Sequence, residues 1–414
     1  MQKYKIFNND CLKQLDEFEE NSIDCIVTDP PYELGFMGKD WDNAGVSFSK
    51  DTWAKCLRVL KPGGYLLAFG GTRTQHRIAC AIEDAGFEIR DCIMWLYGGG
   101  FPKSMNIGLA VDKKLGNESK VVGVGRSGSA ETHTRCMNSQ TKGGKDVFGG
   151  EFEIKEAQNE WKGFGTALKP AYEPIIMARK PFKGTLVNNV LENRVGGLNI
   201  DECRVEIADE KDAQMYHFNN NGNTRLKKAE GEKTGMFDGG WRVQKEEREN
   251  PQGGRFPANI ILDTQEGEEW RRYFYCPKAS KRDRDEGLDN FEAKEGHAKG
   301  NGLDRVCEFC GVSQLKPELC KCPTKSWVAK PQRNFHPTVK PTALMQYLVR
   351  LVAPKGATIL DPFMGSGSTG KAVMFENNDR DANYTFIGIE QDKDYCEIAK
   401  ARIAYASDDS NSEN

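Results

Sequence analysis

The sequence predicts an α/β fold built on an open, mainly parallel sheet. Strand-like and helix-like segments alternate through residues 1–100, the alternation returns after residue 334, and a glycine-rich turn follows a buried-looking strand near the C-terminus. Strands interleaved with helices of about three turns are typical of βαβ units, whose strands pair in parallel. We therefore expect one sheet that draws on both ends of the chain.

The N-terminal segment accounts for half of this sheet. The expected strands are "YKIF", "IDCIV", "GYLLAFG" and "DCIMWLYG", and the expected helices between them are "CLKQLDEF", "TWAKCLRVL" and "RIACAIEDAG". Residues 103–170 are rich in Gly, Ser, Lys and Thr and show little periodicity, which predicts a long loop insertion before the strand "YEPIIMARKP". Residues 1–185 are thus expected to form the N-terminal part of one domain.

The middle of the chain has a different character. Between residues 186 and 333, short apolar runs such as "NIILD" lie among polar tracts that are punctuated by glycine, notably "YHFNNNGNTRLKKAEGEKTG". Sequence of this kind often stays disordered until a partner orders it. We interpret residues 186–333 as a second, irregular domain that is inserted into the first.

The C-terminal segment, residues 334–414, restores regular spacing. Leu344, Leu348 and Leu351 recur at helical intervals, and the strands "ATIL" and "YTFIGIEQD", the helix "YCEIAKARI" and a short polar tail follow. Too little chain remains after the glycine-rich turn to build a sheet of its own. We expect this segment to supply the missing strands of the N-terminal sheet.

Composition sets bounds on location and partners. The 414-residue chain is 38% hydrophobic. No apolar run approaches the ~18 residues of a membrane span, and "MQKYKIFNND" lacks the apolar centre of a signal peptide. We expect a cytoplasmic protein with no membrane partner. Most of the 13 cysteines are isolated, which argues against a disulfide scaffold, and the net charge of −3 means that any polyanion must bind a local basic patch.

The glycine-rich turn "DPFMGSGSTG", residues 361–370, predicts a site for an adenosine-type cofactor. Gly365, Gly367 and Gly370 stand at G-x-G-x-x-G spacing between a strand and a helix, so the backbone can approach a ligand closely. Glu390 ends the next strand, where an acid accepts hydrogen bonds from ribose hydroxyls. These features fit NAD and S-adenosylmethionine alike.

The segment "TDPPY" follows the strand "IDCIV" and suits work on an aromatic amine. An exocyclic amino group is a poor nucleophile because its lone pair is delocalised into the ring. The Asp29 carboxylate and the Pro30 carbonyl can accept both N–H bonds and favour a pyramidal nitrogen, while Pro30 and Pro31 fix the backbone. Tyr32 offers a face for a base that has left its stack.

The ordered motifs resemble the amino-group DNA methyltransferases that use S-adenosylmethionine, in the permuted arrangement called the beta class. In that family a D-P-P-Y block comes first, a target-recognition domain follows, and a D-P-F-x-G-S-G block lies near the C-terminus. Here "TDPPY", the irregular region, "HPTVKP" and "DPFMGSGSTG" follow in that order. The resemblance covers residues 1–185 and 334–406 and is weak between them.

The resemblance implies a Rossmann-like methyltransferase sheet, circularly permuted, with a target-recognition domain at residues 186–333. It implies catalytic contact with the target base for Asp29, Pro30, Pro31 and Tyr32. Cofactor contacts are implied for Asp10, Cys11, Asp29, Lys340, Pro341, Thr342, Asp361, Pro362, Phe363, Gly365, Gly367 and Glu390. The block around Lys340 is expected near the methionine carboxylate, where a helix N-terminus favours negative charge. For Asp10 and Cys11, in "NNDC", a surface turn is the alternative.

The expected function is site-specific methylation of adenine N6 in duplex DNA, with S-adenosylmethionine as donor and base flipping as the route. Asp before "PPY" resembles the adenine-N6 members, and cytosine-N4 methylation is the alternative. Cytosine-C5 chemistry needs a nucleophilic cysteine, usually in a Pro-Cys pair, and Cys276-Pro277 has the opposite order. An RNA methyltransferase, a nicotinamide oxidoreductase and a non-enzymatic zinc-bearing DNA-binding module are the rival classes.

The one cysteine cluster predicts a structural zinc knuckle over residues 307–322. Cys307 and Cys310 form one pair and Cys320 and Cys322 another, at a spacing that lets four thiolates bind one tetrahedral zinc. Reduced cysteines without metal are the alternative. Two pairs so close together leave little room for a substrate, so we expect no catalytic metal.

A basic and aromatic run, "RRYFYCPKASKRDR" at residues 271–284, has two interpretations. Phosphate contact combined with base stacking is one, and a solvated edge strand is the other. His336, in "HPTVKP", is interpreted as a positioning residue. The expected macromolecular partner is double-stranded DNA, a cognate restriction endonuclease is a candidate partner, and both a monomer and a homodimer are compatible with the sequence.

Overall fold

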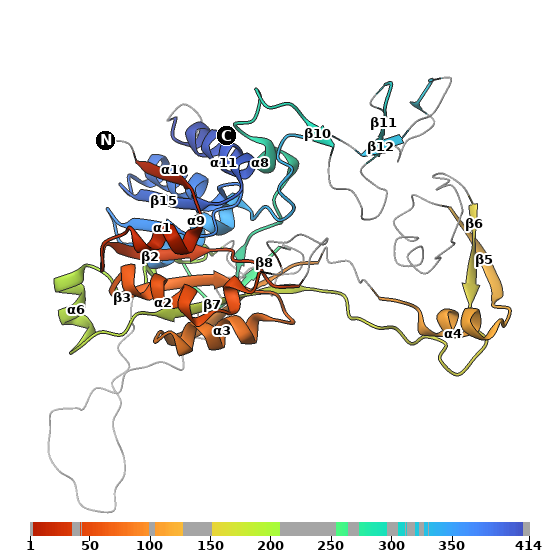
Figure 1. Cartoon of the computed structure of the whole chain (residues 1–414), viewed down its shortest axis with the longest axis horizontal. Coiled ribbons are helices and arrows are strands. Elements are labelled where there is room, and N and C mark those ends of the chain that lie inside the picture. Colours follow the sequence, from red (N-terminus) through yellow and green to blue (C-terminus); the bar gives the residue numbers. More distant parts are fainter. Residues whose placement is uncertain are drawn as a thin grey trace, which may run out of the picture.

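The computed structural model describes residues 3–34, 42, 44–98, 104–126, 151–207, 254–263, 273–295, 305–310, 312, 319–322, 327–329 and 331–408. Within them, one mixed sheet has nine strands in the order β1-β15-β14-β2-β3-β7-β4-β8-β9 (Figure 1). Its strands are β1 (Tyr4–Asn8), β2 (Ile23–Thr28), β3 (Leu60–Phe69), β4 (Glu88–Leu96), β7 (Tyr172–Arg179), β8 (Ile260–Leu262), β9 (Phe274–Tyr275), β14 (Thr358–Asp361) and β15 (Thr385–Glu390). The predicted α/β class is confirmed. The tract "YHFNNNGNTRLKKAEGEKTG" lies outside the described residues.

Both ends of the chain build this sheet. Strand β14 pairs in parallel with β2 and with β15, and β15 pairs in parallel with β1 at the edge. Ile359 lies opposite Cys25, and Leu360 lies opposite Ile26. The strands near the C-terminus therefore stand inside the sheet that the N-terminal strands begin.

Helices cover both faces of the sheet. Val27 and Leu67 pack with α9 (Thr342–Val352), α10 (Ser368–Arg380) and α11 (Lys393–Ala406). Their neighbours Ile26 and Leu66 pack with α1 (Cys11–Asp16), α2 (Lys50–Val59) and α3 (Gln75–Asp84). Successive residues of a strand point to opposite faces, so strands that are apolar at every position need a helix layer on each side.

Two strands of the main sheet come from the region between residues 186 and 333. Strand β8 pairs in parallel with β4, and β9 pairs in parallel with β8 at the far edge. They have three and two residues, too short to show a period of alternation. Helix α6 (Leu186–Asn193) also contacts β3. The region is thus joined to the sheet at several points, and the bounds 186 and 333 stay a prediction.

The loop insertion expected at residues 103–170 contains regular structure. Helix α4 (Ile107–Leu115) and the antiparallel hairpin of β5 (Lys120–Arg126) and β6 (Glu151–Glu156) stand apart from the sheet in Figure 1. The buried Asp112 accepts hydrogen bonds from Asn159 Nδ2 at 2.6 Å and Gln158 N at 3.2 Å. Asp112 thus joins α4 to the segment that follows β6.

Short elements complete the described chain. They are η3 (Val46–Phe48), η5 (Asp201–Cys203), α8 (Lys281–Asp285), β10 (Lys294–Glu295), β11 (Arg305–Cys307), β12 (Trp327–Ala329) and β13 (Pro331–Gln332). Strand β10 pairs with β13, and β11 pairs with β12, both antiparallel. None of the helices in the described ranges is long and apolar enough to cross a membrane.

A buried ion pair between α9 and α10 gives a test of the packing. The Glu376 side chain is 1% exposed and accepts hydrogen bonds from Arg350 Nε at 3.0 Å and from Gln346 Nε2 at 3.2 Å. We expect Glu376→Gln to lower the free energy of unfolding by about 1.5–3 kcal/mol, because a charged acceptor in a buried site is lost. Urea denaturation measures this change. Lys355→Ala, which removes an exposed pair with Asp381, is the control and should leave the stability unchanged. Equal stability of Glu376→Gln and the unaltered protein would contradict the expectation.

Candidate active site

A cavity of about 1370 Å³ lies where β2, β14 and β15 end. The carboxyl ends of parallel strands meet at one edge of a sheet, and ligands of open α/β sheets bind there. The predicted site residues that line it are Asp10, Cys11, Asp29, Pro30, Pro31, Tyr32, Lys340, Asp361, Pro362, Phe363, Gly365 and Glu390. Pro341, Thr342 and Gly367 are not among the lining residues. Segments more than 300 residues apart in the sequence thus share one cavity.

The glycine-rich turn is held by Asp361 at the end of β14. Its carboxylate accepts hydrogen bonds from Thr28 Oγ1 at 2.6 Å, Thr369 Oγ1 at 2.5 Å and Phe363 N at 3.1 Å. Burial raises the pKa of Asp361 to about 6, although these donors oppose the shift. This one side chain connects β2, the turn and the start of α10.

Glycine is required at several positions of the turn, and Gly365 and Gly370 show the two reasons. Gly365 has φ +55°, and a Cβ there would lie 2.9 Å from His336 Nε2. A Cβ at Gly370 would lie 2.4 Å from Ile403 Cδ1 and 2.5 Å from Phe386 Cε1. The first glycine allows the turn, and the second allows α10 to pack closely on β15 and α11.

Glu390 lies at the end of β15 and faces the same turn. Its Oε2 accepts a hydrogen bond from Gly365 N at 2.9 Å, and its Oε1 accepts one from Asp392 N at 2.7 Å. Burial raises its pKa to about 7, although these two N–H groups oppose the shift. A carboxylate that lines a cavity and titrates near neutrality is suited to ligand binding.

Asp10 and Cys11 combine the two interpretations offered for them. Asp10 is the N-cap of α1, and its Oδ1 accepts hydrogen bonds from Leu12 N at 3.0 Å and Lys13 N at 3.1 Å. Both residues also line the cavity. Burial raises the pKa of the Cys11 thiol to about 12, so the thiol is neutral. They form part of the wall and carry no nucleophile.

Asp29 directly follows β2 and lies within a cluster of charges. Lys340 Nζ lies 2.5 Å from Asp29 Oδ2 and 3.4 Å from Glu173 Oε2, and Tyr32 Oη donates a hydrogen bond to Glu173 Oε2 at 3.1 Å. The other oxygen, Asp29 Oδ1, is buried and has no hydrogen-bond partner among the described residues. One side of the Asp29 carboxylate is therefore fixed, and the other is left to accept.

The charges in this cluster shift one another's pKa values. Burial raises the pKa of Asp29, and the Lys340 ammonium opposes this shift only in part. Burial acts to lower the pKa of Lys340, but Asp29 and Glu173 outweigh it and the pKa lies above its ordinary value. The pKa of Tyr32 is well above its ordinary value, through burial and through the two carboxylates. Tyr32 thus stays neutral.

The sequence analysis missed Glu173, on β7. The signal was an acid inside the strand "YEPIIMARKP", whose following residues are buried, because an acid entering an apolar strand needs a partner. Its partners, Lys340 and Tyr32, lie in distant segments, so no spacing could reveal them. It lines the cavity with both of them.

Thr342 is placed beside a carboxylate of the protein itself. Its N donates a hydrogen bond to Asp283 Oδ2 at 2.9 Å, and its hydroxyl binds Asp283 Oδ1. The N-terminus of α9 is thus covered by an acid from α8. The expected contact with a cofactor carboxylate stays a prediction.

The described part of the basic run packs against α9 and against the residue that follows β4; Arg271 and Arg272 lie outside the described residues. The Phe274 ring stacks on Tyr347 at 4.2 Å between centroids, and Lys278 Nζ lies 3.6 Å from the centroid of Tyr97. Strand β9 is an edge strand with Tyr275 exposed, as the second interpretation expects. Phosphate contact by this run stays a prediction.

The side chains of His336 and Cys276 are both uncharged at neutral pH. Burial lowers the pKa of His336 to about 3, so the ring is neutral, and it packs edge-on against Tyr395 at 4.6 Å. This placement agrees with a positioning residue. Cys276 is buried, and burial raises the pKa of its thiol to about 12, which disfavours a nucleophilic role.

The four clustered cysteines come together. The sulfur atoms of Cys307, Cys310, Cys320 and Cys322 all lie within 4.8 Å of one another, and the Cys310 and Cys320 sulfurs are 3.6 Å apart. Neighbouring sulfurs around a tetrahedral zinc lie about 3.8 Å apart, since each Zn–S bond is about 2.3 Å. The arrangement fits such an ion.

Comparisons with known proteins identify a family and relatives of this chain. The chain matches the family model for DNA methylase (N6_N4_Mtase) over residues 23–401. It is 37% identical over 106 residues to the Type II methyltransferase M.HpaI of Haemophilus parainfluenzae, a match that covers 24% of this chain and 34% of that protein. It is 22% identical over 238 residues to the Type II methyltransferase M.HindIII of Haemophilus influenzae, covering 47% of this chain and 64% of that protein.

Two solved structures were also compared. The M1.HpyAVI complex with SAM has 16% identity and a TM-score of 0.36, covering 96% of this chain and 99% of that one. The cytosine-N4-specific PvuII DNA methyltransferase has 13% identity and a TM-score of 0.42, covering 97% and 86%. Because the family match extends over residues 23–401, which is most of the chain, the protein belongs to the DNA methylase family.

Proposed function

We propose that the protein transfers a methyl group from S-adenosylmethionine to the exocyclic N6 of adenine in duplex DNA, after the base has been flipped into the cavity. The observation that carries this proposal is the Asp29 carboxylate at the end of β2. Its Oδ2 is held by Lys340, while its buried Oδ1 has no partner among the described residues. A buried acceptor without a donor is costly, so it marks a place for a donor from a ligand.

The cavity fits the cofactor together with a base. Its volume of about 1370 Å³ exceeds the roughly 300–1,000 Å³ of an ordinary small-molecule site. Glu390 would accept the ribose hydroxyls, Phe363 and Gly365 would flank the cofactor, and Asp10 with Cys11 would contact its adenine. Lys340, Pro341 and Thr342, with Gly367 in the turn, complete the proposed set. When bound, S-adenosylmethionine supplies an electrophilic methyl group.

Asp29 and Pro30 would hold the attacking amine. Asp29 Oδ1 accepts one N–H bond, and the Pro30 carbonyl is the proposed second acceptor. Ser47 Oγ donates a hydrogen bond to the carbonyl oxygen of Pro31 at 2.7 Å, which fixes the turn that aims both acceptors. Two acceptors on one amino group direct its lone pair towards the methyl group, so transfer needs no covalent intermediate with the protein.

The surrounding charges would handle the released proton. Lys340 keeps Asp29 oriented and favours its ionised form, while burial raises the pKa of Asp29 above that of an exposed carboxylate. A raised pKa makes Asp29 a better proton acceptor once the amine has been methylated. Glu173 fixes the hydroxyl of Tyr32 and so holds its ring as a stacking face for the base.

Adenine N6 is proposed because Asp29 precedes "PPY" in the manner of the adenine-N6 members. Cytosine N4 is the second candidate, since the name of the matched family covers N6 and N4 enzymes alike. Both reactions use an exocyclic amine and the same acceptors. Identification of the methylated base separates them.

The arrangement of the chain is proposed to be the permuted one. Strands β14 and β15, which follow the target motif by more than 300 residues, stand between β1 and β2 in the sheet. We propose that residues 1–185 and 334–414 form the catalytic domain and that residues 186–333 contain the target-recognition domain. We further propose a structural zinc on the four clustered cysteines.

The proposed partners follow from the activity. Duplex DNA is the substrate, and a cognate restriction endonuclease is a proposed partner because two relatives are named Type II methyltransferases. We also propose that the protein resides in the cytoplasm, together with its DNA substrate.

Asp29→Asn tests the proposed acceptor. We expect methyl transfer to duplex DNA to fall by about 10²–10⁴-fold, because the amide loses the charge that holds Lys340 and that accepts the proton. Transfer of radioactive methyl groups and modification-sensitive sequencing measure the rate and the modified base. Asp16→Asn, in an exposed pair with Lys55, is the control and should retain the activity. An undiminished rate for Asp29→Asn would overturn the proposal.

Glu390 predicts that cofactor affinity depends on pH. Its pKa in the free protein is about 7, so the carboxylate that accepts ribose hydroxyls is present above pH 7 and is lost as the pH falls through 7. Because the ionised fraction changes about tenfold, S-adenosylmethionine should bind about tenfold more weakly at pH 6 than at pH 8. Calorimetric titration measures this, and Glu390→Gln should bind weakly at both values. An affinity in the unaltered protein that is independent of pH would contradict the assignment.

The proposed zinc site predicts metal content and a separable effect. The purified protein should contain about one zinc per chain, and Cys310→Ser with Cys322→Ser should abolish it. We expect the double variant to lose DNA affinity and to keep its affinity for S-adenosylmethionine, since the cluster lies outside the cavity lining. Elemental analysis and binding assays measure both. Cys80→Ser, at an exposed cysteine outside the cluster, should change neither, and full metal content in the double variant would exclude this site.

A further inference from the structure

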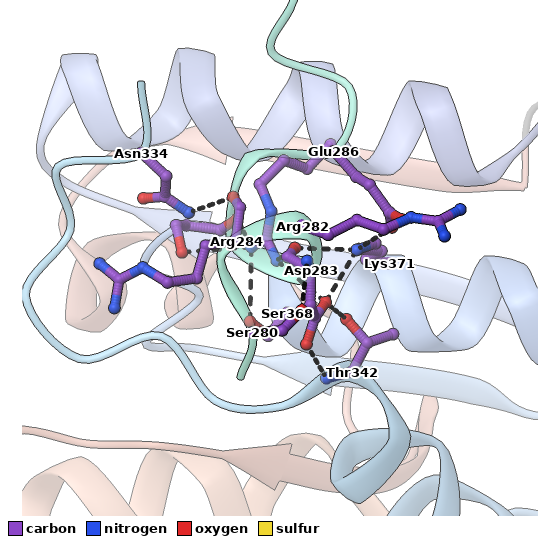
Figure 2. A network of polar contacts seen from close by, with 11 residues as sticks. Ser280, Arg282, Asp283, Arg284, Glu286, Asn334, Thr342, Ser368 and Lys371 are labelled. Carbon is purple, nitrogen blue, oxygen red and sulfur yellow. Dashed lines mark hydrogen bonds and ion pairs between the residues drawn. The ribbon is translucent and has the colours of Figure 1, made fainter. Parts of the chain in front are cut away.

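Helix α8 docks beside the glycine-rich turn, although it belongs to the region proposed for target recognition. Figure 2 shows its residues beside Thr342, which begins α9, and beside Ser368 and Lys371 of α10. Ser280 caps the helix and accepts a hydrogen bond from Asp283 N at 3.1 Å. At Gly287, just beyond the helix, a Cβ would lie 2.6 Å from Tyr405 Cβ of α11. The segment therefore packs closely against α11 and contacts α10, the helix that begins within the glycine-rich turn.

Asp283 is the centre of this contact (Figure 2). Its carboxylate accepts hydrogen bonds from Thr342 N at 2.9 Å and from Lys371 Nζ at 2.9 Å, and its carbonyl oxygen accepts one from Arg402 at 3.1 Å. The Lys371 side chain is 1% exposed and that of Arg402 is 0% exposed. Glu286 adds a second carboxylate, 2.8 Å from Lys371 Nζ. One residue of α8 thus joins the first turn of α9 to buried cations of α10 and α11.

Arg402 connects Asp283 to the glycine-rich turn. Its Nη1 donates hydrogen bonds to the Ser366 carbonyl oxygen at 2.6 Å and to Ser366 Oγ at 3.2 Å. Ser366 lines the cavity, while Arg402 and Asp283 are not among the lining residues. A chain of contacts therefore runs from Asp283 through Arg402 to the backbone of the turn.

Arg284 supplies a second and separate contact. Its Nη2 donates a hydrogen bond to the carbonyl oxygen of His336 at 3.0 Å, and its own carbonyl oxygen accepts one from Asn334 Nδ2 at 3.0 Å. The His336 ring lies directly against Gly365, with no room for a Cβ between them. Two neighbouring residues of α8 thus support the turn at Ser366 and at Gly365.

We propose that α8 acts as a brace, that is, that it holds the glycine-rich turn in the conformation that binds the cofactor. Asp283 and Arg284 are then positioning residues for S-adenosylmethionine. Neither residue lines the cavity. Arg284 binds the carbonyl oxygen of His336, which lines it, and Asp283 acts through Arg402 on Ser366, which also lines it. The inference rests on the proposed function in so far as the turn binds this cofactor. Its consequence is that cofactor affinity depends on a segment of the region proposed for target recognition.

Asp283→Asn tests the brace against a merely structural role. We expect the Kd and the KM for S-adenosylmethionine to rise about tenfold or more, because the charge-assisted hydrogen bonds that support the turn are weakened, and the loss of one such bond corresponds to about tenfold or more in an equilibrium constant. At saturating cofactor, kcat should change by less than about threefold. Calorimetric titration and steady-state kinetics on the full chain measure these quantities below the unfolding temperatures of all variants.

Glu376→Gln is the matched control. It also alters a buried acid that joins α9 to α10, yet Glu376 contacts neither α8 nor the turn in any contact found among the described residues. It should lower the Tm and leave the Kd for S-adenosylmethionine unchanged. Arg284→Met, which removes the side-chain hydrogen bond to the His336 carbonyl oxygen and keeps the backbone contact with Asn334, is the second test should Asp283→Asn not fold, and its Kd should also rise.

The outcomes separate the two hypotheses. If the unaltered protein binds S-adenosylmethionine and both variants of α8 bind it equally well, the brace is overturned and the proposed function stands. If Asp283→Asn, Arg284→Met and Glu376→Gln all weaken binding in proportion to their loss of Tm, the role of α8 is structural and the brace is again overturned. If the unaltered protein does not bind S-adenosylmethionine, the proposed function itself fails.

Discussion

Strand β14 pairs with β2, and the rest of the structure depends on this junction between the two ends of the chain. Only Ile359 and Leu360 take part in the backbone register, and a side chain fixes each end of the junction. Asp24 Oδ2 accepts a hydrogen bond from Thr358 N at 2.7 Å where the strands begin. Thr28 donates one to Asp361 at 2.6 Å where they end. The second of these also orients the carboxylate that holds the glycine-rich turn, so the sheet and the cavity are aligned by the same contact.

The proposed active site contains several charged groups that are largely buried. Lys340 is 7% exposed, and its ammonium lies between Asp29 and Glu173. Burying an ion is unfavourable unless it is paired, and two carboxylates around one ammonium leave a negative excess in the cluster. That excess keeps Lys340 protonated and raises the pKa of Tyr32. The cluster is therefore suited to accept hydrogen bonds and a proton, as an attacking amine requires.

A second buried cluster of charges, formed by Lys371, Arg402, Asp283 and Glu286, lies outside the cavity lining. Lys371 and Arg402 lie on α10 and α11, and the acids that neutralise them come from α8. Because two fully buried cations depend on these acids, the docking of α8 is coupled to the stability of the helix layer over the sheet. Strands β8 and β9 add a further connection at the other edge of the sheet. The region between residues 186 and 333 therefore contributes strands to the main sheet and contacts to the helices beside the cavity.

Local patterns determined much of this protein from the sequence alone. Apolar runs and helical spacing predicted the α/β class and the sharing of the sheet by both ends, because strands buried on two faces are apolar at every position. The ordered motifs, with the strand-end acids Asp29 and Glu390, predicted site residues most of which line one cavity. Only the tertiary structure decided the rest. Glu173, Asp283 and Arg402 have partners far away in the chain, and β8 is too short for a pattern of its own. Periodicity reports which face of an element is buried, whereas the pairing of buried charges depends on which elements fold together, and no local pattern carries that information.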